Sequence, residues 1–161
     1  MELMELAMAV AERLEKRGLK LATAESCTGG WAAQVLTSVP GSSAWFERGF
    51  VTYTNSAKQE MLGVSAETLE LNGAVSEETV REMAQGTIRH SHAQVSLAIS
   101  GVAGPAGGSV EKPVGTVCFG WAHKGAKTIS CRQHFDGDRE AVRRQAVVFA
   151  LQGVIDLFRE D

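Results

Sequence analysis

Ser26, Lys58 and Tyr53 carry the side chains of this sequence that best fit hydrolytic chemistry. Ser26 follows a short apolar segment and precedes a glycine pair, which is where a strand would turn into a helix. A serine hydroxyl is a weak nucleophile until a neighbouring base takes its proton. Lys58 is the candidate base, because the dipole of a short predicted helix disfavours a cation in its first turn and so favours the neutral amine. Tyr53, the only tyrosine, would donate a hydrogen bond to the leaving group or to the lysine.

Each of these residues also has an ordinary structural interpretation. A hydroxyl before a helix usually caps it, and Ser26 or Thr28 would do so. A capping box, however, needs Glu or Gln three residues after Ser26, where Gly29 stands. Most lysines are solvated, and a tyrosine on a strand usually packs. The four histidines lack the i, i+4 spacing of a zinc site. Spacing alone therefore leaves both interpretations open.

Two further features of the Ser26 segment bear on its chemistry. Gly29 and Gly30 disfavour a helix unless the backbone must approach another group closely, so free amides at the helix start are expected to form an oxyanion hole. Cys27 is an alternative nucleophile, because thiolates at helix starts are strongly nucleophilic.

Arg139 and a glycine-rich loop are the candidate substrate-binding features. Arg139 stands at the first position of the last predicted helix, where a phosphate or carboxylate ligand would explain a cation. Pairing with the neighbouring acids Asp136, Asp138 or Glu140 is the alternative. The loop 101–109 follows a predicted strand but matches neither the P-loop nor the dinucleotide fingerprint. We interpret it as a substrate-lining loop, with Ser100 at the strand end and with Gly101 and Gly104 permitting close approach.

Strands and helices alternate along the chain in a way that would bring these residues to one edge of a sheet. Apolar spacing predicts helices over 3–17, from 31 to about Pro40, around Lys58, over 75–90 and from Asp138, which would cap the last helix. Strands are predicted over 19–24, 46–54, 93–100, 115–123 and 127–135, the last two as a hairpin. Asn55 and Ser56 are expected to cap the helix around Lys58. The pattern favours an α/β fold, a three-layer α/β/α sandwich with a mixed sheet, in a single domain over 1–161.

The composition excludes several functional classes. The chain has 161 residues, 44% of them hydrophobic, and a formal charge of -3, so no basic surface for nucleic acid is expected. No apolar run approaches the roughly 18 residues of a membrane span, and the N-terminal stretch lacks the pattern of a signal peptide. Three widely spaced cysteines indicate neither a disulfide framework nor a zinc site. These features predict a cytoplasmic protein that binds neither nucleic acid nor membrane.

Four ordered motifs resemble those of the CinA C-terminal domain family. The segment 24–30, Ala-Glu-Ser-Cys-Thr-Gly-Gly, looks like its AESCTGG signature. The segment 49–58 is similar to its G-x-V-x-Y-[ST]-N-x-x-K motif, which ends here at Lys58. The segment 100–105 resembles [ST]-G-x-A-G-P, and 135–139 resembles F-x-G-[DN]-R, which ends at Arg139. Together these motifs span most of the chain, and four in order are far more specific than any one of them.

The resemblance implies the three-layer fold, a homodimer and, in active members, deamidation of nicotinamide mononucleotide to nicotinic acid mononucleotide and ammonia. It implies no metal and no cofactor. Ser26 would be the nucleophile and Lys58 the general base, with amides near Gly29 and Gly30 or near Gly101 holding the oxyanion. The residues implied to line or assist the site are Tyr53, Thr28, Ser100 and Arg139.

The chain departs from the family pattern in the presumed substrate loop. Ala106 stands where a glycine is expected, and Ser109 and Val110 stand where Thr-Pro usually does. A catalytically silent nucleotide-binding or regulatory protein is therefore the alternative function. The aromatic residues Trp31, Trp45, Phe46 and Trp121 fit either a dimer interface or the core.

Overall fold

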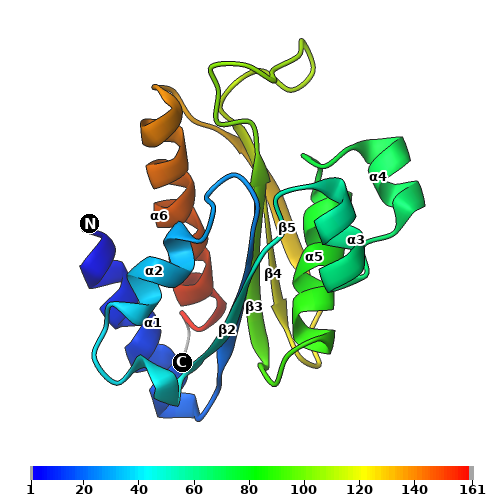
Figure 1. Cartoon of the computed structure of the whole chain (residues 1–161). Coiled ribbons are helices and arrows are strands. Elements are labelled where there is room, and N and C mark those ends of the chain that lie inside the picture. Colours follow the sequence, from blue (N-terminus) through cyan, green and yellow to red (C-terminus); the bar gives the residue numbers. More distant parts are fainter. Residues whose placement is uncertain (1, 160–161) are drawn as a thin grey trace.

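A mixed five-stranded sheet lies between two layers of helices in the computed structural model, which describes residues 2–159 (Figure 1). Its strands, in spatial order, are β2 (Phe46–Val51), β1 (Leu21–Glu25), β3 (Val95–Gly101), β4 (Thr116–His123) and β5 (Ile129–His134). One face is covered by α1 (Leu3–Arg17), α2 (Trp31–Thr37) and α6 (Arg139–Leu157). The other is covered by α3 (Asn55–Leu62), α4 (Ala66–Asn72) and α5 (Glu77–Arg89). The predicted α/β/α sandwich with a mixed sheet is confirmed.

The directions of the strands place several candidate residues at one edge of the sheet. β1 is parallel to both of its neighbours, β2 and β3, whereas β4 is antiparallel to β3 and to β5. The carboxyl ends of β1, β2 and β3 therefore meet at the same edge. From β1 the chain passes through α2 to β2 on one side of β1. It then passes through α3, α4 and α5 to β3 on the other side of β1. Such a reversal opens a crevice at the strand ends, the usual ligand position in open α/β sheets.

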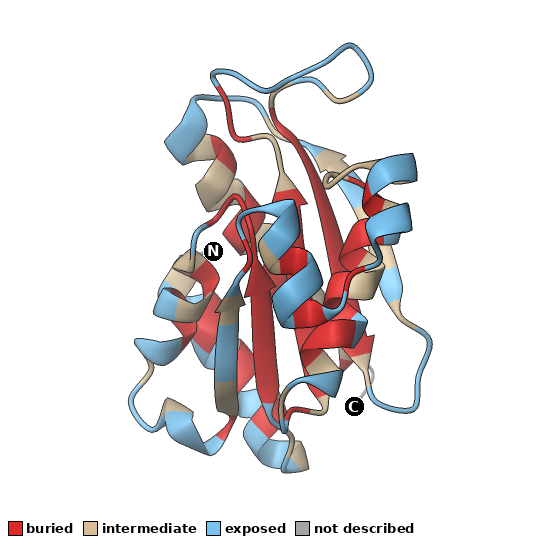
Figure 2. Cartoon of the chain, turned by 45° about the vertical axis from the view of Figure 1, so that its right-hand side comes forward, coloured by how far each residue is buried: buried red, intermediate tan, exposed pale blue. Residues whose placement is uncertain are grey.

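The core has two parts, one on each face of the sheet, and Figure 2 shows the central strands as its most buried elements. α1, α2 and α6 contribute apolar side chains to the larger part, and α5 to the smaller. Trp45 and Trp121 are buried in the larger part, and Trp31 and Phe46 pack against it. Trp45 and Trp121 thus belong to the core of the chain itself, whereas Trp31 and Phe46 are partly exposed at its edge.

Most predicted elements are present, with changes at their ends. The antiparallel pair β4 and β5 and the Asp138 cap of α6 are as predicted, and α1 ends at a left-handed Gly18. The strand predicted over 46–54 ends at Val51, and Thr54 caps α3 in place of Asn55 or Ser56 by accepting from the Ala57 amide. α4 and a short 3-10 turn, Ser42–Ala44, were not predicted. Within residues 2–159 no helix combines the length and the apolar character needed to cross a membrane.

Candidate active site

A pocket of about 260 Å³ lies at the carboxyl ends of β1 and β3, beside the start of α3. Seven of the ten sequence-predicted site residues line it: Ser26, Tyr53, Lys58, Ser100, Gly101, Gly104 and Arg139. They come from four separate segments of the chain, which the parallel strands bring to one edge. Thr28, Gly29 and Gly30 lie in the turn beyond Ser26 and are not part of the pocket wall.

Ser26 and Lys58 are in direct contact, with 3.2 Å between the serine Oγ and the lysine Nζ. Lys58 is the fourth residue of α3, and helical side chains lean toward the N-terminus of their helix, which carries Nζ back toward β1 and the end of β2. There Nζ also donates to the carbonyl oxygens of Thr52, at 3.0 Å, and Tyr53, at 3.3 Å. The main chain after β2 thus holds the amine against the serine.

Burial sets the charge state that Lys58 favours. Its side chain is only 1% exposed, and desolvation lowers the pKa of the amine below its ordinary value. A neutral amine has two N–H donors and one lone pair. If the carbonyls of Thr52 and Tyr53 accept the two N–H groups, the lone pair faces the Ser26 hydroxyl. A Ser26 hydroxyl that turns from the Tyr53 carbonyl to this lone pair can then lose its proton to the lysine.

Cys27 lines the same pocket but has the wrong charge state for a nucleophile. Its side chain is buried, and desolvation raises the pKa of the thiol to about 11. Near neutral pH the group is therefore almost entirely a thiol, and only the thiolate is a strong nucleophile. The three cysteines of the chain are all free.

Tyr53 and Arg139 meet at the mouth of the pocket. The Arg139 guanidinium donates to the Tyr53 hydroxyl at 3.2 Å and to the Gly104 carbonyl at 2.8 Å. In the described chain it forms no ion pair with the acids next to it in sequence. Tyr53 is 57% exposed as a whole, whereas its main-chain carbonyl accepts from both Ser26 and Lys58. Tyr53 thus contacts the Ser26–Lys58 pair through its backbone and contacts Arg139 through its side chain.

The glycines of the 101–109 loop have a structural explanation that spacing did not reveal. A Cβ on Gly101 would lie 2.7 Å from Val117, and one on Gly104 would lie 2.5 Å from Val114. Gly104 also has a left-handed backbone, with φ of 85°. These glycines let the loop pack on the chain's own residues just before and at the start of β4. Beyond them, residues 105–111 form exposed chain (Figure 2).

Part of the predicted oxyanion hole at the start of α2 is taken up by Glu25, which accepts hydrogen bonds from two of the first amides of this helix. The Glu25 side chain, only 1% exposed, accepts from the Ala32 amide at 2.9 Å and the Ala33 amide at 3.0 Å. It also accepts from the Thr28 hydroxyl at 2.6 Å. The Gly29 amide donates to the Ser26 carbonyl. Of the two places predicted to supply oxyanion donors, only the wall that contains Gly101 borders the pocket.

Glu25 and Arg143 were not singled out from the sequence, although signals for both exist. α2 begins after Gly30, which has no side chain to cap it, so its first amides need a partner from elsewhere. Arg143 stands four residues after Arg139, on the same face of α6. Its guanidinium donates to the Cys27 carbonyl at 3.0 Å and the Thr28 carbonyl at 3.2 Å. Both residues therefore hold the turn that follows Ser26.

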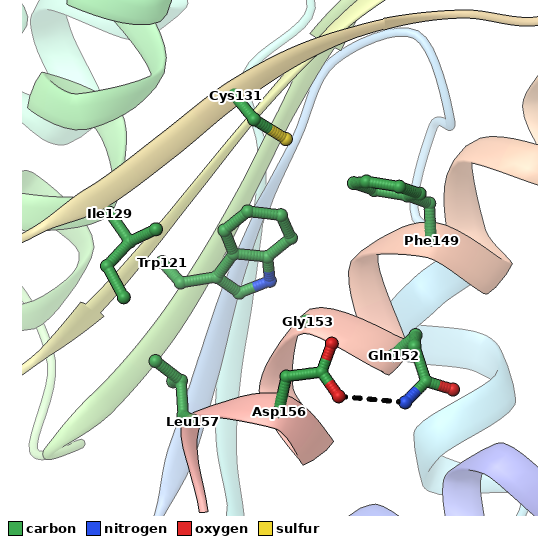
Figure 3. Close-up of a pocket in the computed structure, with 8 residues that line it drawn as sticks. All are labelled: Trp121, Ile129, Cys131, Phe149, Gln152, Gly153, Asp156 and Leu157. Atoms are coloured by element: carbon green, nitrogen blue, oxygen red, sulfur yellow. Dashed lines mark hydrogen bonds between the residues drawn. The ribbon is translucent and has the colours of Figure 1, made fainter. Parts of the chain in front are cut away.

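A second, more apolar hollow of about 400 Å³ lies between the β4–β5 pair and α6 (Figure 3). Trp121, Cys131 and Phe149 face it, and at its rim Gln152 donates to Asp156. Burial raises the pKa of the Cys131 thiol, so no activated nucleophile faces this hollow. The hydrolytic residues are gathered in the first pocket.

Comparison with known proteins agrees with the motifs. The family model of the CinA C-terminal domain matches residues 3–158. The chain is 54% identical to the nicotinamide-nucleotide amidohydrolase PncC of Escherichia coli (strain K12), over 99% of this chain and 97% of that protein. It is 51% identical to the protein of the same name from Pseudomonas putida, over 96% of both chains.

The fold also matches a solved structure over the whole chain. The crystal structure of a competence-damaged protein (CinA) superfamily protein from Klebsiella pneumoniae superposes with a TM-score of 0.95, at 42% identity and 100% coverage of both chains. A match of sequence, motifs and fold over almost the whole length has one explanation. This chain belongs to the CinA C-terminal domain family.

Proposed function

We propose that this protein hydrolyses the carboxamide of nicotinamide mononucleotide, with Ser26 as the nucleophile and Lys58 as the general base. The reaction follows from relatives at 51–54% identity that are named nicotinamide-nucleotide amidohydrolases and that match over nearly their whole length. The observation that carries the mechanism is the 3.2 Å contact between the Ser26 hydroxyl and the buried Lys58 amine.

In the first half of the reaction, the Ser26 oxygen attacks the carboxamide carbon while Lys58 takes the hydroxyl proton. The carbonyl oxygen becomes an oxyanion, and we assign its hydrogen-bond donors to the pocket wall that contains Gly101. The C–N bond then breaks as Lys58 returns the proton to the leaving nitrogen. Ammonia departs, and the nicotinoyl group stays on Ser26 as an ester.

In the second half, water attacks the ester and Lys58, neutral again, accepts a proton from that water. Breaking the ester bond returns the proton to Ser26 and releases nicotinic acid mononucleotide. One amide and one water are consumed, and one acid and one ammonia are formed. Every step uses groups of the pocket and water.

The remaining pocket residues bind and orient the substrate in this proposal. Arg139 is the one cation of the pocket wall that is not used as the base, so we assign the substrate phosphate to it. Ser100, Gly101 and Gly104 border the nicotinamide. Tyr53 keeps Arg139 at the mouth through the hydroxyl contact. Thr28, Gly29 and Gly30, which lie outside the pocket, shape the turn that carries Ser26.

Ammonia release from nicotinamide mononucleotide tests the proposal directly. The wild-type protein is expected to release ammonia, and Ser26→Ala and Lys58→Ala each to lose at least about 10³-fold in kcat while keeping the wild-type circular dichroism spectrum. Ser100→Ala is the comparison variant, since it removes a second buried hydroxyl from the same pocket and, at a residue that borders the nicotinamide, should act mainly on KM. It is expected to keep most of kcat. Wild-type protein that releases no ammonia at any pH from 6 to 10 would end the assignment.

One further variant and one further measurement separate the alternatives. Cys27→Ala is expected to stay within about tenfold of wild type, because the thiol is protonated at neutral pH. A loss as large as that of Ser26→Ala would make Cys27 the nucleophile. Calorimetry that detects nucleotide binding without turnover would favour the silent homologue. The homodimer and the cytoplasmic location stay predictions, which light scattering and cell fractionation test.

A further inference from the structure

We propose that Glu25 is a positioning residue for the hydrolytic reaction: its buried side chain holds the turn over 26–31 so that the Ser26 oxygen stays within reach of Lys58. This rests on the proposed function of the Ser26–Lys58 pair. Glu25 does not line the pocket, so it acts on the nucleophile without touching the substrate.

All three contacts of the Glu25 carboxylate are with groups that donate hydrogen bonds. One oxygen accepts from the Thr28 hydroxyl at 2.6 Å and from the Ala32 amide at 2.9 Å, and the other accepts from the Ala33 amide at 3.0 Å. Hydrogen bonds to a carboxylate are shorter and stronger than those between neutral groups. The first residues of α2 and the turn before it are thereby fastened to the last residue of β1.

Ser26 lies inside the loop that this carboxylate closes. The contact from Glu25 to Thr28 spans Ser26 and Cys27, so those two residues have little freedom to move relative to β1. From the other side, the Arg143 guanidinium binds the carbonyls of Cys27 and Thr28. The turn is held by an acceptor on one side and by donors on the other.

The backbone of Glu25 is also linked to Lys58, through hydrogen bonds of Thr52. Its carbonyl accepts from the Thr52 amide at 2.8 Å, and the Thr52 carbonyl in turn accepts from the Lys58 amine at 3.0 Å. One residue therefore positions both members of the pair, the serine through its side chain and the lysine through its main chain. A replacement of the side chain changes the first link and leaves the second.

A capping carboxylate elsewhere in the chain offers a matched control. Glu82 accepts from the Ser65 amide at 2.8 Å and from the Thr68 hydroxyl, at the start of α4. It resembles Glu25 in accepting from both a main-chain amide and a threonine hydroxyl, but it is not part of the pocket wall. If Glu25 acted only by capping a helix, replacing Glu82 should have the same effect on activity as replacing Glu25.

The test compares Glu25→Gln with Glu82→Gln in the ammonia assay. A glutamine amide nitrogen would face an N–H donor at one of the Glu25 contacts, so the turn is expected to loosen. We expect kcat to fall at least about tenfold with KM within about threefold. The acid limb of the pH–kcat profile should move to higher pH, because water reaches Lys58 and restores its affinity for a proton. Glu82→Gln should keep the wild-type kcat and acid limb.

Two variants of Thr28 test the same contact without altering Glu25. Thr28→Val removes the donor at nearly constant shape and is expected to lower kcat, whereas Thr28→Ser keeps the hydroxyl and is expected to restore it. This pair carries the test if Glu25→Gln does not fold. Wild-type kcat and acid limb in folded Glu25→Gln, or equal kcat in the two Thr28 variants, would overturn the proposal.

Labelling of Ser26 by a fluorophosphonate separates this proposal from the proposed function, because it requires no turnover of nucleotide. Slower labelling of Glu25→Gln than of Glu82→Gln is expected if the carboxylate positions the serine. Wild-type protein that labels but releases no ammonia would refute the nucleotide reaction alone. Equal labelling rates in the two variants would refute the positioning role.

Discussion

Lys58 illustrates how burial at a single residue prepares a charge state. A lysine in water holds its proton at neutral pH and has no lone pair to offer. Here the side chain is enclosed, and three oxygen atoms, two of them main-chain carbonyls, surround the amine. Carbonyl dipoles orient the amine without the full charge that would keep it protonated. The absence of a carboxylate among these contacts suits a base better than a structural ion pair.

The pH dependence of activity should report this amine. Desolvation lowers the pKa of Lys58, and the reaction needs the unprotonated form, so kcat/KM should rise with pH through that lowered pKa. The midpoint is expected below the ordinary value for lysine. Ammonia release measured from pH 5 to 10 checks this. Lys58→Arg, which stays charged throughout, should show no such limb and at least about 10³-fold lower activity. A wild-type rate that falls as pH rises through this range would contradict the assignment.

The sequence was informative about residues that stand at the ends of strands or the starts of helices. Ser26, Lys58 and Arg139 could be selected because a side chain at such a position faces the edge of a sheet. Glu25 also ends a strand, but its hydrogen bonds to the turn could not be inferred from that position. Its partners lie three to eight residues further along a turn, and spacing does not specify the path of a turn. For the same reason, spacing did not reveal that Glu25 takes up the Ala32 and Ala33 amides at the start of α2.

At the scale of elements, α5 determines where α3 and therefore Lys58 can lie. Gly86 in α5 is packed so closely against α3 that a Cβ there would lie 2.0 Å from the Leu62 carbonyl oxygen. Leu62 is one turn beyond Lys58 in the same helix. A side chain at position 86 would therefore push away the helix that carries the base.

Gly86→Ala should lower both stability and turnover. Overpacking is expected to reduce the free energy of unfolding by about 1–3 kcal/mol. Displacing the amine by a fraction of an ångström should lower kcat about tenfold in the folded protein. Gly153→Ala is the control, since its Cβ would lie 2.2 Å from the Trp121 ring, beside the second hollow. Denaturant unfolding and ammonia release should show two destabilised proteins, of which only Gly86→Ala is slow. Wild-type kcat in folded Gly86→Ala would show that α3 does not move.

The elements themselves were largely predictable because their apolar periods differ. β3 is almost wholly buried, α1 has a buried stripe at helical spacing, and both stand out in the sequence. α4 did not stand out, because only Leu69 of its seven residues is buried. Its start depends on the Ser65 cap and on Glu82 from α5, which are contacts of the folded chain. Short helices held by tertiary contacts leave little periodic signal.

At the scale of the whole molecule, two segments that are far apart in the chain form separate parts of the pocket wall. Ala74 and Val75 form one wall, and the loop from Gly101 to Gly107 forms another. Lys112, beyond that loop, donates to the Asn72 carbonyl at the end of α4 at 2.6 Å. This contact joins the two walls outside the pocket. The loop lines the pocket, and it is where the chain departs from its family pattern. We therefore expect this tether, the contact between Lys112 and Asn72, to affect substrate binding more than the fold.

Lys112→Met should weaken substrate binding and leave the chemistry intact. The variant keeps the apolar stem and removes the bond to the Asn72 carbonyl, worth about 1 kcal/mol, so the loop must be ordered when substrate binds. KM for nicotinamide mononucleotide is expected to rise about three- to tenfold with kcat within about threefold. Lys124→Met, in the turn between β4 and β5, is the control and should match wild type. Loosening a wall of the pocket should change how much substrate is bound and leave the contact between Ser26 and Lys58 in place. A fall in kcat at constant KM would therefore contradict this prediction and would mean that the tether acts on the catalytic groups.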